Sequence, residues 1–366
     1  MKLVPSIAAA AALALLAAAN THAAEIPKNY PTEYKDIVEA SKAENDLIIY
    51  SNLSDFNWKP IVEKFNSLYP WIKVKALQLG TLEGFTRYEI ESGSGARSAD
   101  MLALGSIDGW LEFLKKPDSI NRYESPERAH VPKWSIPFPG LYTMSTDPMI
   151  MVYNKLVVPK DEQPSSLADV IKATQARPAF YKNGLTSYSG VGSYGQPIYL
   201  SWTMKDGDKA WNSIEALARF TQPEESGGSM LAKLSSGEYK VGYFLSGITF
   251  FPKMGGAQDK LLGWAFPKDG TPVVLRGTAI TGKARSVNSA KLMLDFILSE
   301  QGQKAISQGG LTPYRPGLPK DAIRYFSYDS IAEQIGEENI ILVSYADKFL
   351  ERVAEFRERY KVIKGH

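Results

Sequence analysis

Short apolar runs alternate with amphipathic helices near the start of the chain, and this order restricts the fold more than any other feature. The runs have the composition of buried strands that stop at small or hydroxyl residues, and the residues between them repeat at helical spacing. Strands are expected at 45–51, 71–80 and 99–106, with helices at 58–68 and 82–92. Strands separated by helices form parallel sheets covered by helices. The sequence therefore predicts an α/β fold.

The N-terminus has the layout of a cleaved secretory signal. It carries Lys2, an apolar run from Ile7 to Ala19 and small residues before Glu25. A run of this length is too short to cross a bilayer core of about 30 Å as a helix. We therefore expect residues 1–23 to be a signal peptide and the mature protein to act in the periplasm.

Composition excludes several classes of chemistry. The chain has no cysteine, so an exported product has neither disulfides nor a lipid anchor on cysteine. Its histidines are His22 in the signal, His130 and the last residue, which leaves little for a catalytic triad or a zinc site. We expect no catalytic residues, no metal ligands and no cofactor.

Charge does not indicate a nucleic-acid partner. The 42 basic and 40 acidic residues nearly balance, and no block of Lys and Arg occurs. Nucleic-acid binding requires a concentrated basic face. No nucleic-acid partner is expected.

The turn at 189–195, SGVGSYG, spells the G-x-G-x-x-G pattern of dinucleotide-binding loops. The preceding stretch contains Pro178 and Gly184 instead of an apolar strand, and an exported protein meets little NAD. Glycine amides before a helix start can also hold a smaller anion. The competing interpretation is a Gly/Ser surface turn.

The middle of the chain is bracketed by extended runs at 148–154 and 271–282, which predicts a chain that crosses twice between two lobes. A helix is expected at 205–220 and a long helix from Asn288 to Gly309. The expected divisions are lobe 1 at 24–148 plus 276–320, lobe 2 at 149–275, and helices at 321–366 that pack on a lobe.

Five segments in order carry a resemblance to a known family: LIIYSNLSD, ESGSGARSADMLALGS, PMIMVYNK, LSSGEYKVGYFLSG and NSAKLMLDFILSEQGQKAISQGGLTPYRPG. They resemble the periplasmic solute-binding proteins of ABC importers, in the group that serves ferric iron, thiamine, polyamines, phosphonates and sugar phosphates. The resemblance implies two mainly parallel, helix-flanked lobes joined by hinge strands at about 149–154 and 273–280. It also implies closure on a ligand, an inner-membrane ABC permease as partner, and a monomer without enzymatic activity.

The sequence departs from the ferric members of that family. Those members carry two adjacent tyrosines at the positions that match Gly247 and Ile248 here, and Tyr243 alone cannot replace the pair. Ser54 also stands where some of them have a histidine. The preferred ligand is therefore a small organic anion: a carboxylate, a phosphonate or a phosphate ester. The alternatives are ferric iron, free or chelated, and an exported enzyme on the same fold.

Candidate ligand contacts are an arginine in an apolar run, where its charge is costly to bury, and polar groups at strand ends and in the glycine turn. They are Ser51, Asn52, Arg87, Ser106, Ser187, Ser189, Gly190, Gly192, Ser193, Ser246 and Arg276. Arg276 is the leading candidate, and an interlobe ion pair is its alternative. For Arg87 the alternative is a structural role, and for Ser246 it is a turn at the end of a strand.

Overall fold

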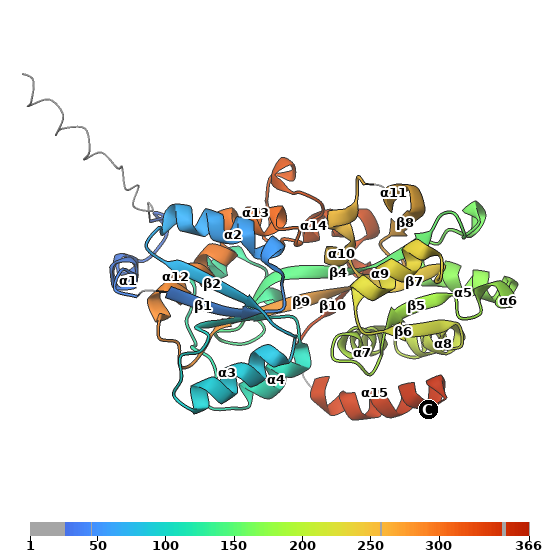
Figure 1. Ribbon diagram of the computed structural model, residues 1–366, viewed down its shortest axis with the longest axis horizontal. Helices are drawn as coiled ribbons and strands as arrows, with labels where there is room; N and C mark the ends of the chain where they lie inside the picture. The colour runs from blue at the N-terminus through green and yellow to red at the C-terminus, as the bar shows by residue number, and fades with distance from the viewer. Residues whose placement is uncertain (1–25, 45, 257, 346–348, 366) are drawn as a thin grey trace, which may run out of the picture.

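A computed structural model describes residues 26–44, 46–256, 258–345 and 349–365, so the expected signal peptide lies outside the described residues. Two α/β lobes lie side by side and share two long central strands (Figure 1). The strands run in the order β2-β1-β3-β9-β4-β7-β5-β6, with β10 beside β9 and β8 beside β4. Among the described helices, none is both long and apolar enough to cross a membrane.

The first lobe contains the predicted alternation of strands and helices. Its strands are β1 (Asp46–Ser51), β2 (Lys73–Gln78) and β3 (Met101–Leu104), and β1 pairs in parallel with both neighbours. Its helices are α1 (Tyr34–Ser41), α2 (Asp55–Leu68), α3 (Glu83–Gly93), α4 (Ile107–Leu114), α12 (Val287–Leu298) and α13 (Glu300–Gln308). The three strands and two helices expected here are confirmed.

The second lobe repeats this plan. Its strands are β5 (Leu185–Tyr188), β6 (Thr221–Glu224), β7 (Val241–Ser246) and β8 (Leu262–Ala265), of which β5 pairs in parallel with β6 and β7. Its helices are α5 (Leu167–Ala176), α6 (Pro178–Tyr181), α7 (Gly195–Asp206), α8 (Asp208–Ala218), α9 (Gly227–Ser236), α10 (Gly247–Phe250) and α11 (Gln258–Leu261).

Two long antiparallel strands connect the lobes. They are β4 (Tyr142–Asn154) and β9 (Thr271–Ile280). The first half of β4 pairs with β9, and its second half pairs with β7 and β8. The other edge of β9 pairs with β3 of the first lobe. Both extended runs expected from the sequence are therefore confirmed, and each contributes to the junction of the lobes.

The chain after residue 320 forms α14 (Tyr328–Ile335), β10 (Ile340–Val343) and α15 (Phe349–Lys364). Helices were expected in this segment, whereas β10 was not. α15 packs on the second lobe, where Phe356 contacts Trp211 of α8 and Tyr360 contacts Tyr199 of α7. Short 3-10 helices lie at Pro126–His130, Lys133–Ser135, Lys160–Glu162, Phe251–Lys253, Lys320–Ala322 and Glu337–Asn339.

Two helices expected to be continuous are broken. The helix from Asn288 stops at Leu298 and restarts at Glu300, because the Ser299 hydroxyl accepts a bond from Gly302 N and caps a new helix. Gly302 is needed there, since a Cβ would lie 1.7 Å from Phe296 O. The helix expected at 205–220 breaks at Gly207, whose φ of 54° favours glycine.

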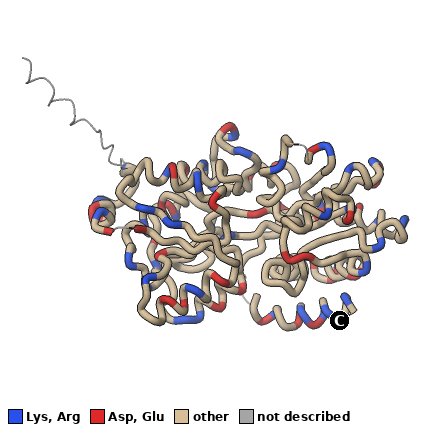
Figure 2. Tube along the Cα trace, in the orientation of Figure 1, with Lys and Arg blue, Asp and Glu red and all other residues tan. Residues whose placement is uncertain are grey.

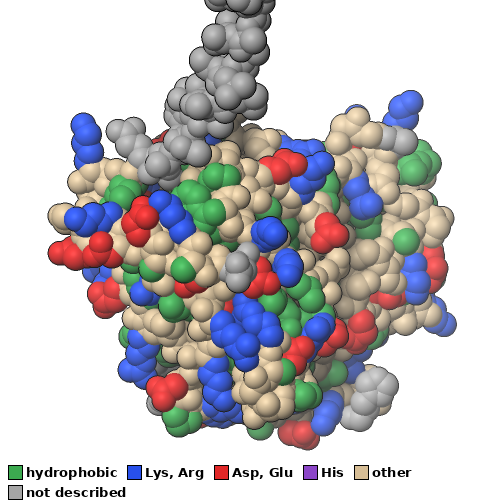
Figure 3. Space-filling view, turned by 60° about the vertical axis from the view of Figure 1, so that its left-hand side comes forward, with side chains coloured by type: hydrophobic (Ala, Val, Ile, Leu, Met, Phe, Trp, Pro, Cys, Tyr) green, Lys and Arg blue, Asp and Glu red, His purple; other side chains and the backbone are tan. Residues whose placement is uncertain are grey.

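Basic and acidic residues are interspersed along the trace (Figure 2). The surface at the first-lobe end of the molecule likewise mixes both signs with scattered apolar side chains (Figure 3). Charge on this face does not collect into a single-sign field of the kind that draws a polyelectrolyte.

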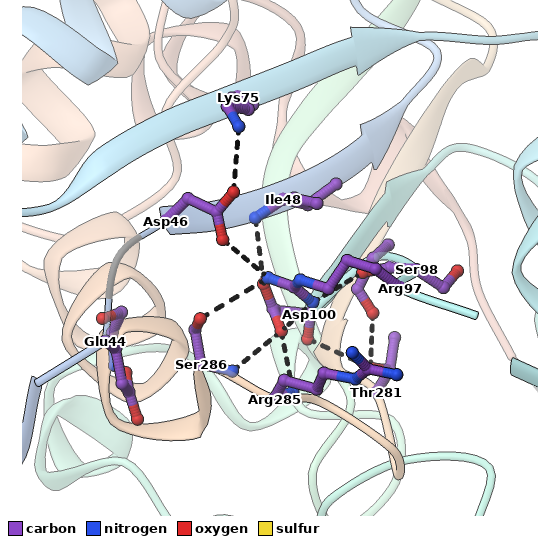
Figure 4. A network of polar contacts seen from close by, with 12 residues as sticks. Glu44, Asp46, Ile48, Lys75, Arg97, Ser98, Asp100, Thr281, Arg285 and Ser286 are labelled. Carbon is purple, nitrogen blue, oxygen red and sulfur yellow. Dashed lines mark hydrogen bonds and ion pairs between the residues drawn. The ribbon is translucent and has the colours of Figure 1, made fainter. Parts of the chain in front are cut away.

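A buried carboxylate fixes the edge of the first lobe where its strands begin (Figure 4). Asp100 is fully buried, and its Oδ1 accepts bonds from the backbone N of Arg285 and of Ser286 at 2.9 and 3.0 Å. Its Oδ2 accepts from Ile48 N at 3.0 Å and from Arg97 Nη2 at 2.6 Å. The side-chain bond to Asp100 raises the pKa of Arg97. One side chain thus ties β1 and the start of β3 to the chain that leaves β9.

We predict that Asp100→Asn lowers the free energy of unfolding by about 3 kcal/mol, because the buried side of an ion pair loses its charge. Asp36→Asn on the exposed face of α1 is the matched control and should change it by less than about 0.5 kcal/mol. Urea unfolding of both variants measures the difference. Equal stabilities would contradict a structural role for Asp100.

Candidate functional site

The carboxyl ends of the parallel strands in both lobes meet at the connection between the lobes. Asn52 follows β1 and Gly105 follows β3, whereas Ser246 ends β7 in the other lobe. Arg276 of β9 and Asp147 of β4 lie between them, on the two connecting strands. Ligands of open α/β sheets bind at such strand ends.

Arg276 is anchored to the first lobe. Its side chain is 3% exposed, and Nη1 donates to Asn52 Oδ1, which also accepts from Gly105 N at 3.3 Å. A Cβ at position 105 would lie 3.0 Å from Nη1, so a glycine there leaves room for the guanidinium. Asn52 orients the arginine without neutralising it, because an amide carries no charge.

The rest of the guanidinium keeps hydrogen-bonding capacity. Arg276 Nε is buried and has no hydrogen-bond partner among the described residues. Within that part of the chain, no carboxylate oxygen lies within 4.0 Å of the Arg276 nitrogens. A buried donor without an acceptor is costly, so an arginine in this state is suited to a ligand that supplies one.

Asp147 links the connecting strand to the second lobe. Its Oδ2 accepts bonds from Tyr194 Oη and Ser246 Oγ, each at 2.6 Å, and its Oδ1 accepts from Ile248 N at 3.3 Å. Burial raises the pKa of Asp147, while the charge of Arg276 and these donors oppose the shift. The charge of Arg276 therefore acts on the Asp147 carboxylate, but the hydrogen bonds of that carboxylate come from residues of the second lobe.

Tyr345, just after β10, adds another buried donor near Arg276. Its hydroxyl has no hydrogen-bond partner among the described residues, and a Cβ at Gly277 would lie 2.6 Å from it. Burial raises the pKa of Tyr345, and the charge of Arg276 opposes this. A neutral phenol is a hydrogen-bond donor, so Tyr345 extends the set of unused donors around the arginine.

The glycine turn at 189–195 lies between β5 and α7 and packs against the C-terminal helix. A Cβ at Gly190 would lie 2.3 Å from the Tyr360 ring of α15, and one at Gly195 would lie 2.2 Å from Ser189 O. Gly192 N donates to Ser189 O at 3.1 Å, inside the turn. Close packing therefore accounts for Gly190 and Gly195, independently of any ligand.

The end of the turn reaches the connecting strands through Tyr194, the residue before α7, because its hydroxyl bonds Asp147. The side chains of Ser189 and Ser193 are partly exposed. A carboxylate oxygen of Glu225 would lie 3.0 Å from a Cβ at Gly192, so negative charge adjoins that side of the turn.

Four other residues that we expected at the site are hydrogen-bonded to other groups of the protein or buried within a strand. Ser51 Oγ donates to Ala103 O at 3.0 Å and joins β1 to β3. Ser106 caps α4, where its hydroxyl accepts from Gly109 N at 3.1 Å. Arg87 Nε donates to Glu91 at 2.8 Å. Ser187 is buried in β5, and its hydroxyl has no hydrogen-bond partner among the described residues.

The structure thus brings Asn52, Ser246 and Arg276 together, and adds Asp147, Tyr194 and Tyr345, which the sequence analysis did not select. Asp147 gave only a weak signal, because it follows Ser145 and Thr146 and stands just before the apolar run at 148–154. Tyr194 and Tyr345 gave no such signal, because buried tyrosines are common.

Comparisons with known proteins give the same architecture. No protein-family model matches the sequence. No curated protein matches it. A substrate-binding protein of an ABC transporter from Agrobacterium tumefaciens aligns with a TM-score of 0.74 at 19% identity, over 86% of this chain and 94% of that chain.

Two further solved structures are similar. Apo ferric ion-binding protein A from Pasteurella haemolytica has a TM-score of 0.65 at 15% identity, over 88% of this chain and 97% of its own. The periplasmic binding protein AfuA from Actinobacillus pleuropneumoniae, with fructose-6-phosphate bound, has a TM-score of 0.62 at 18% identity, over 87% and 99%. This chain therefore has the two-lobed fold of the periplasmic substrate-binding proteins of ABC transporters.

Proposed function

We propose that this chain is an extracytoplasmic solute-binding component of an ABC importer, which captures a small organic anion between its lobes and delivers it to an inner-membrane permease. The fold shared with the binding proteins above supports the transport role. The observation that carries the ligand class is Arg276, a buried arginine between the lobes that has an unused N–H and no direct ion pair among the described residues.

The donors around Arg276 suit an anion with two or more oxygens. A guanidinium can donate two parallel bonds to a carboxylate, phosphonate or phosphate ester, and Tyr345 offers a further hydroxyl. The net charge of the site depends on Asp147. An ionised Asp147 balances the positive charge of Arg276, whereas a protonated Asp147 does not. Burial raises the pKa of Asp147, and an anion bound beside it would raise that pKa further.

The way the lobes are connected supports closure on the ligand. Asn52 holds Arg276 from one lobe, and Tyr194 and Ser246 hold Asp147 from the other. A ligand that contacts both sets of residues would stabilise the closed arrangement. We assign lobe 1 to 24–148 plus 276–320, lobe 2 to 149–275, and propose a monomeric, periplasmic protein without enzymatic activity.

A bare ferric ion fits these residues less well. Tyr243 is buried in the second lobe with its hydroxyl 2.9 Å from Thr221 Oγ1, and burial raises the pKa of Tyr243, which opposes the phenolate that iron prefers. Gly247 and Ile248 begin α10 and bring no phenol. The fold does not separate the two ligand classes, since its neighbours include a ferric-binding and a sugar-phosphate-bound protein. The residues around Arg276 favour the anion.

We predict that a panel of carboxylates, phosphonates and phosphate esters contains a ligand that raises the melting temperature, because binding to the native state alone stabilises it. Arg276→Gln should weaken that ligand about 10- to 100-fold in calorimetric titrations, since a charge-assisted hydrogen bond is lost. Arg219→Gln, on the exposed end of α8, is the charge-matched control and should bind like the wild type. Stabilisation by cations or neutral sugars alone would refute the anion assignment.

We predict that Asp147→Asn binds the same anion about tenfold more tightly at pH 7.5, because a negative charge beside the ligand is removed. In the wild type, binding should take up protons, since an anion near Asp147 raises the pKa of that carboxyl further. Calorimetry in buffers of different ionisation enthalpy measures the uptake, and subtracting the variant's value removes the ligand's own titration. Equal uptake by both proteins would show that Asp147 does not titrate with binding.

A further inference from the structure

A pocket in the first lobe is lined by residues of α1 and α12. Figure 1 shows these two helices at one end of the molecule. The volume of the pocket is about 510 Å³. Its wall is aromatic and acidic, and includes Tyr30, Tyr34, Tyr69, Glu127, Asp295 and Phe296. It contains none of the residues around Arg276, so it is separate from the site between the lobes.

Asp295 is the buried carboxylate of this pocket. Its side chain is 1% exposed, and Oδ2 accepts bonds from Tyr34 Oη and Tyr123 Oη, both at 2.9 Å. The other oxygen, Oδ1, is buried and has no hydrogen-bond partner among the described residues. A buried acceptor without a donor is costly, which makes this oxygen the point where a ligand N–H would be most favourable. Burial raises the pKa of Asp295 to about 7, although the neighbouring hydroxyls of Ser125, Tyr123 and Tyr34 oppose this shift.

The other charged groups of the pocket already have partners. Glu127 accepts bonds from Arg315 Nη1 and Tyr30 Oη, each at 2.6 Å. Glu300 pairs with Lys304. The pocket's arginine is thus committed to Glu127, and Asp295 is left without a cation in the described part of the chain. Asp295 Oδ1 therefore has no positively charged partner among the described residues.

The aromatic rings provide a complementary wall. Tyr30 and Tyr34 pack edge to face with ring centroids 4.6 Å apart, and Tyr69 packs against Phe65 at 5.0 Å. Ring faces attract cations, and their carbon surface accommodates alkyl groups. Among the described lining residues, Arg315 is the one Lys or Arg, and its guanidinium is paired with Glu127.

We infer that this pocket binds a small primary alkylammonium ion, which donates an N–H to Asp295 Oδ1 and packs its alkyl group against the tyrosine rings and Phe296. The wall residues come from α1, α2 and α12 and from the segment around Glu127, so the site is built by the first lobe alone. This inference is independent of the proposed transport ligand.

The test is calorimetric titration of the full mature protein with n-butylammonium chloride at pH 7.5, with potassium chloride as the ionic-strength control. The wild type should bind butylammonium, and tetramethylammonium should bind more weakly because it has no N–H. Asp295→Asn should weaken butylammonium at least about 10-fold, since a charge-assisted hydrogen bond is lost. Arg276→Gln, which alters the other site, should bind it like the wild type.

A second pair of variants keeps the test decisive if Asp295→Asn does not fold. Tyr69→Leu removes a ring from the wall and should weaken butylammonium severalfold, whereas Tyr69→Phe keeps the ring and should not. Near-ultraviolet circular dichroism checks that each variant keeps its native packing. The inference is overturned if the wild type does not bind butylammonium at millimolar concentration, if a folded Asp295→Asn or Tyr69→Leu binds like the wild type, or if Arg276→Gln abolishes binding.

Discussion

The arrangement of this molecule depends on one buried guanidinium placed where two long strands connect two lobes. Arg276 is costly to bury, and the protein compensates by giving it an amide from the first lobe and a carboxylate nearby on the second connecting strand. That carboxylate in turn takes its hydrogen bonds from the second lobe. Arg276 is therefore linked to both lobes through Asn52 and Asp147. A ligand that accepts a hydrogen bond from Arg276 would also affect the contacts between the two lobes.

A buried charged residue lies at each end of the first-lobe strands, and the two residues differ in how fully they are hydrogen-bonded. Where the strands begin, Asp100 is surrounded by backbone amides and Arg97, and its hydrogen-bonding capacity is used within the protein. Where they end, Arg276 keeps an N–H that has no partner in the described part of the chain. A fully bonded buried ion stabilises a fold, whereas an incompletely bonded one is suited to a ligand. This contrast separates a structural cluster from the proposed binding site in the same sheet.

Much of the fold could be predicted from the sequence, because its apolar runs and helical spacing are local signals. The strands at 46–51 and 101–104 and the two connecting strands follow from those runs. Arg276 could be selected because arginine is rare in a buried strand, whereas Asp147 stands beside Ser145 and Thr146, before the apolar run at 148–154, and so gave little signal. β10 is short and apolar, and only its pairing with β9 distinguishes it from a loop. Gly190 packs against Tyr360, and these two residues are far apart in the sequence. The G-x-G-x-x-G motif alone therefore suggested a ligand at Gly190, whereas this packing is enough to account for the glycine.

The most direct test of the central claim is a crystal structure of the protein purified without refolding and crystallised with the tightest-binding anion from the panel. The account predicts electron density for the anion between the lobes, with one of its oxygens within hydrogen-bond distance of Arg276 Nε and Asn52 still bonded to Nη1. A direct ion pair between Arg276 and Asp147, with the anion bound elsewhere, would contradict it.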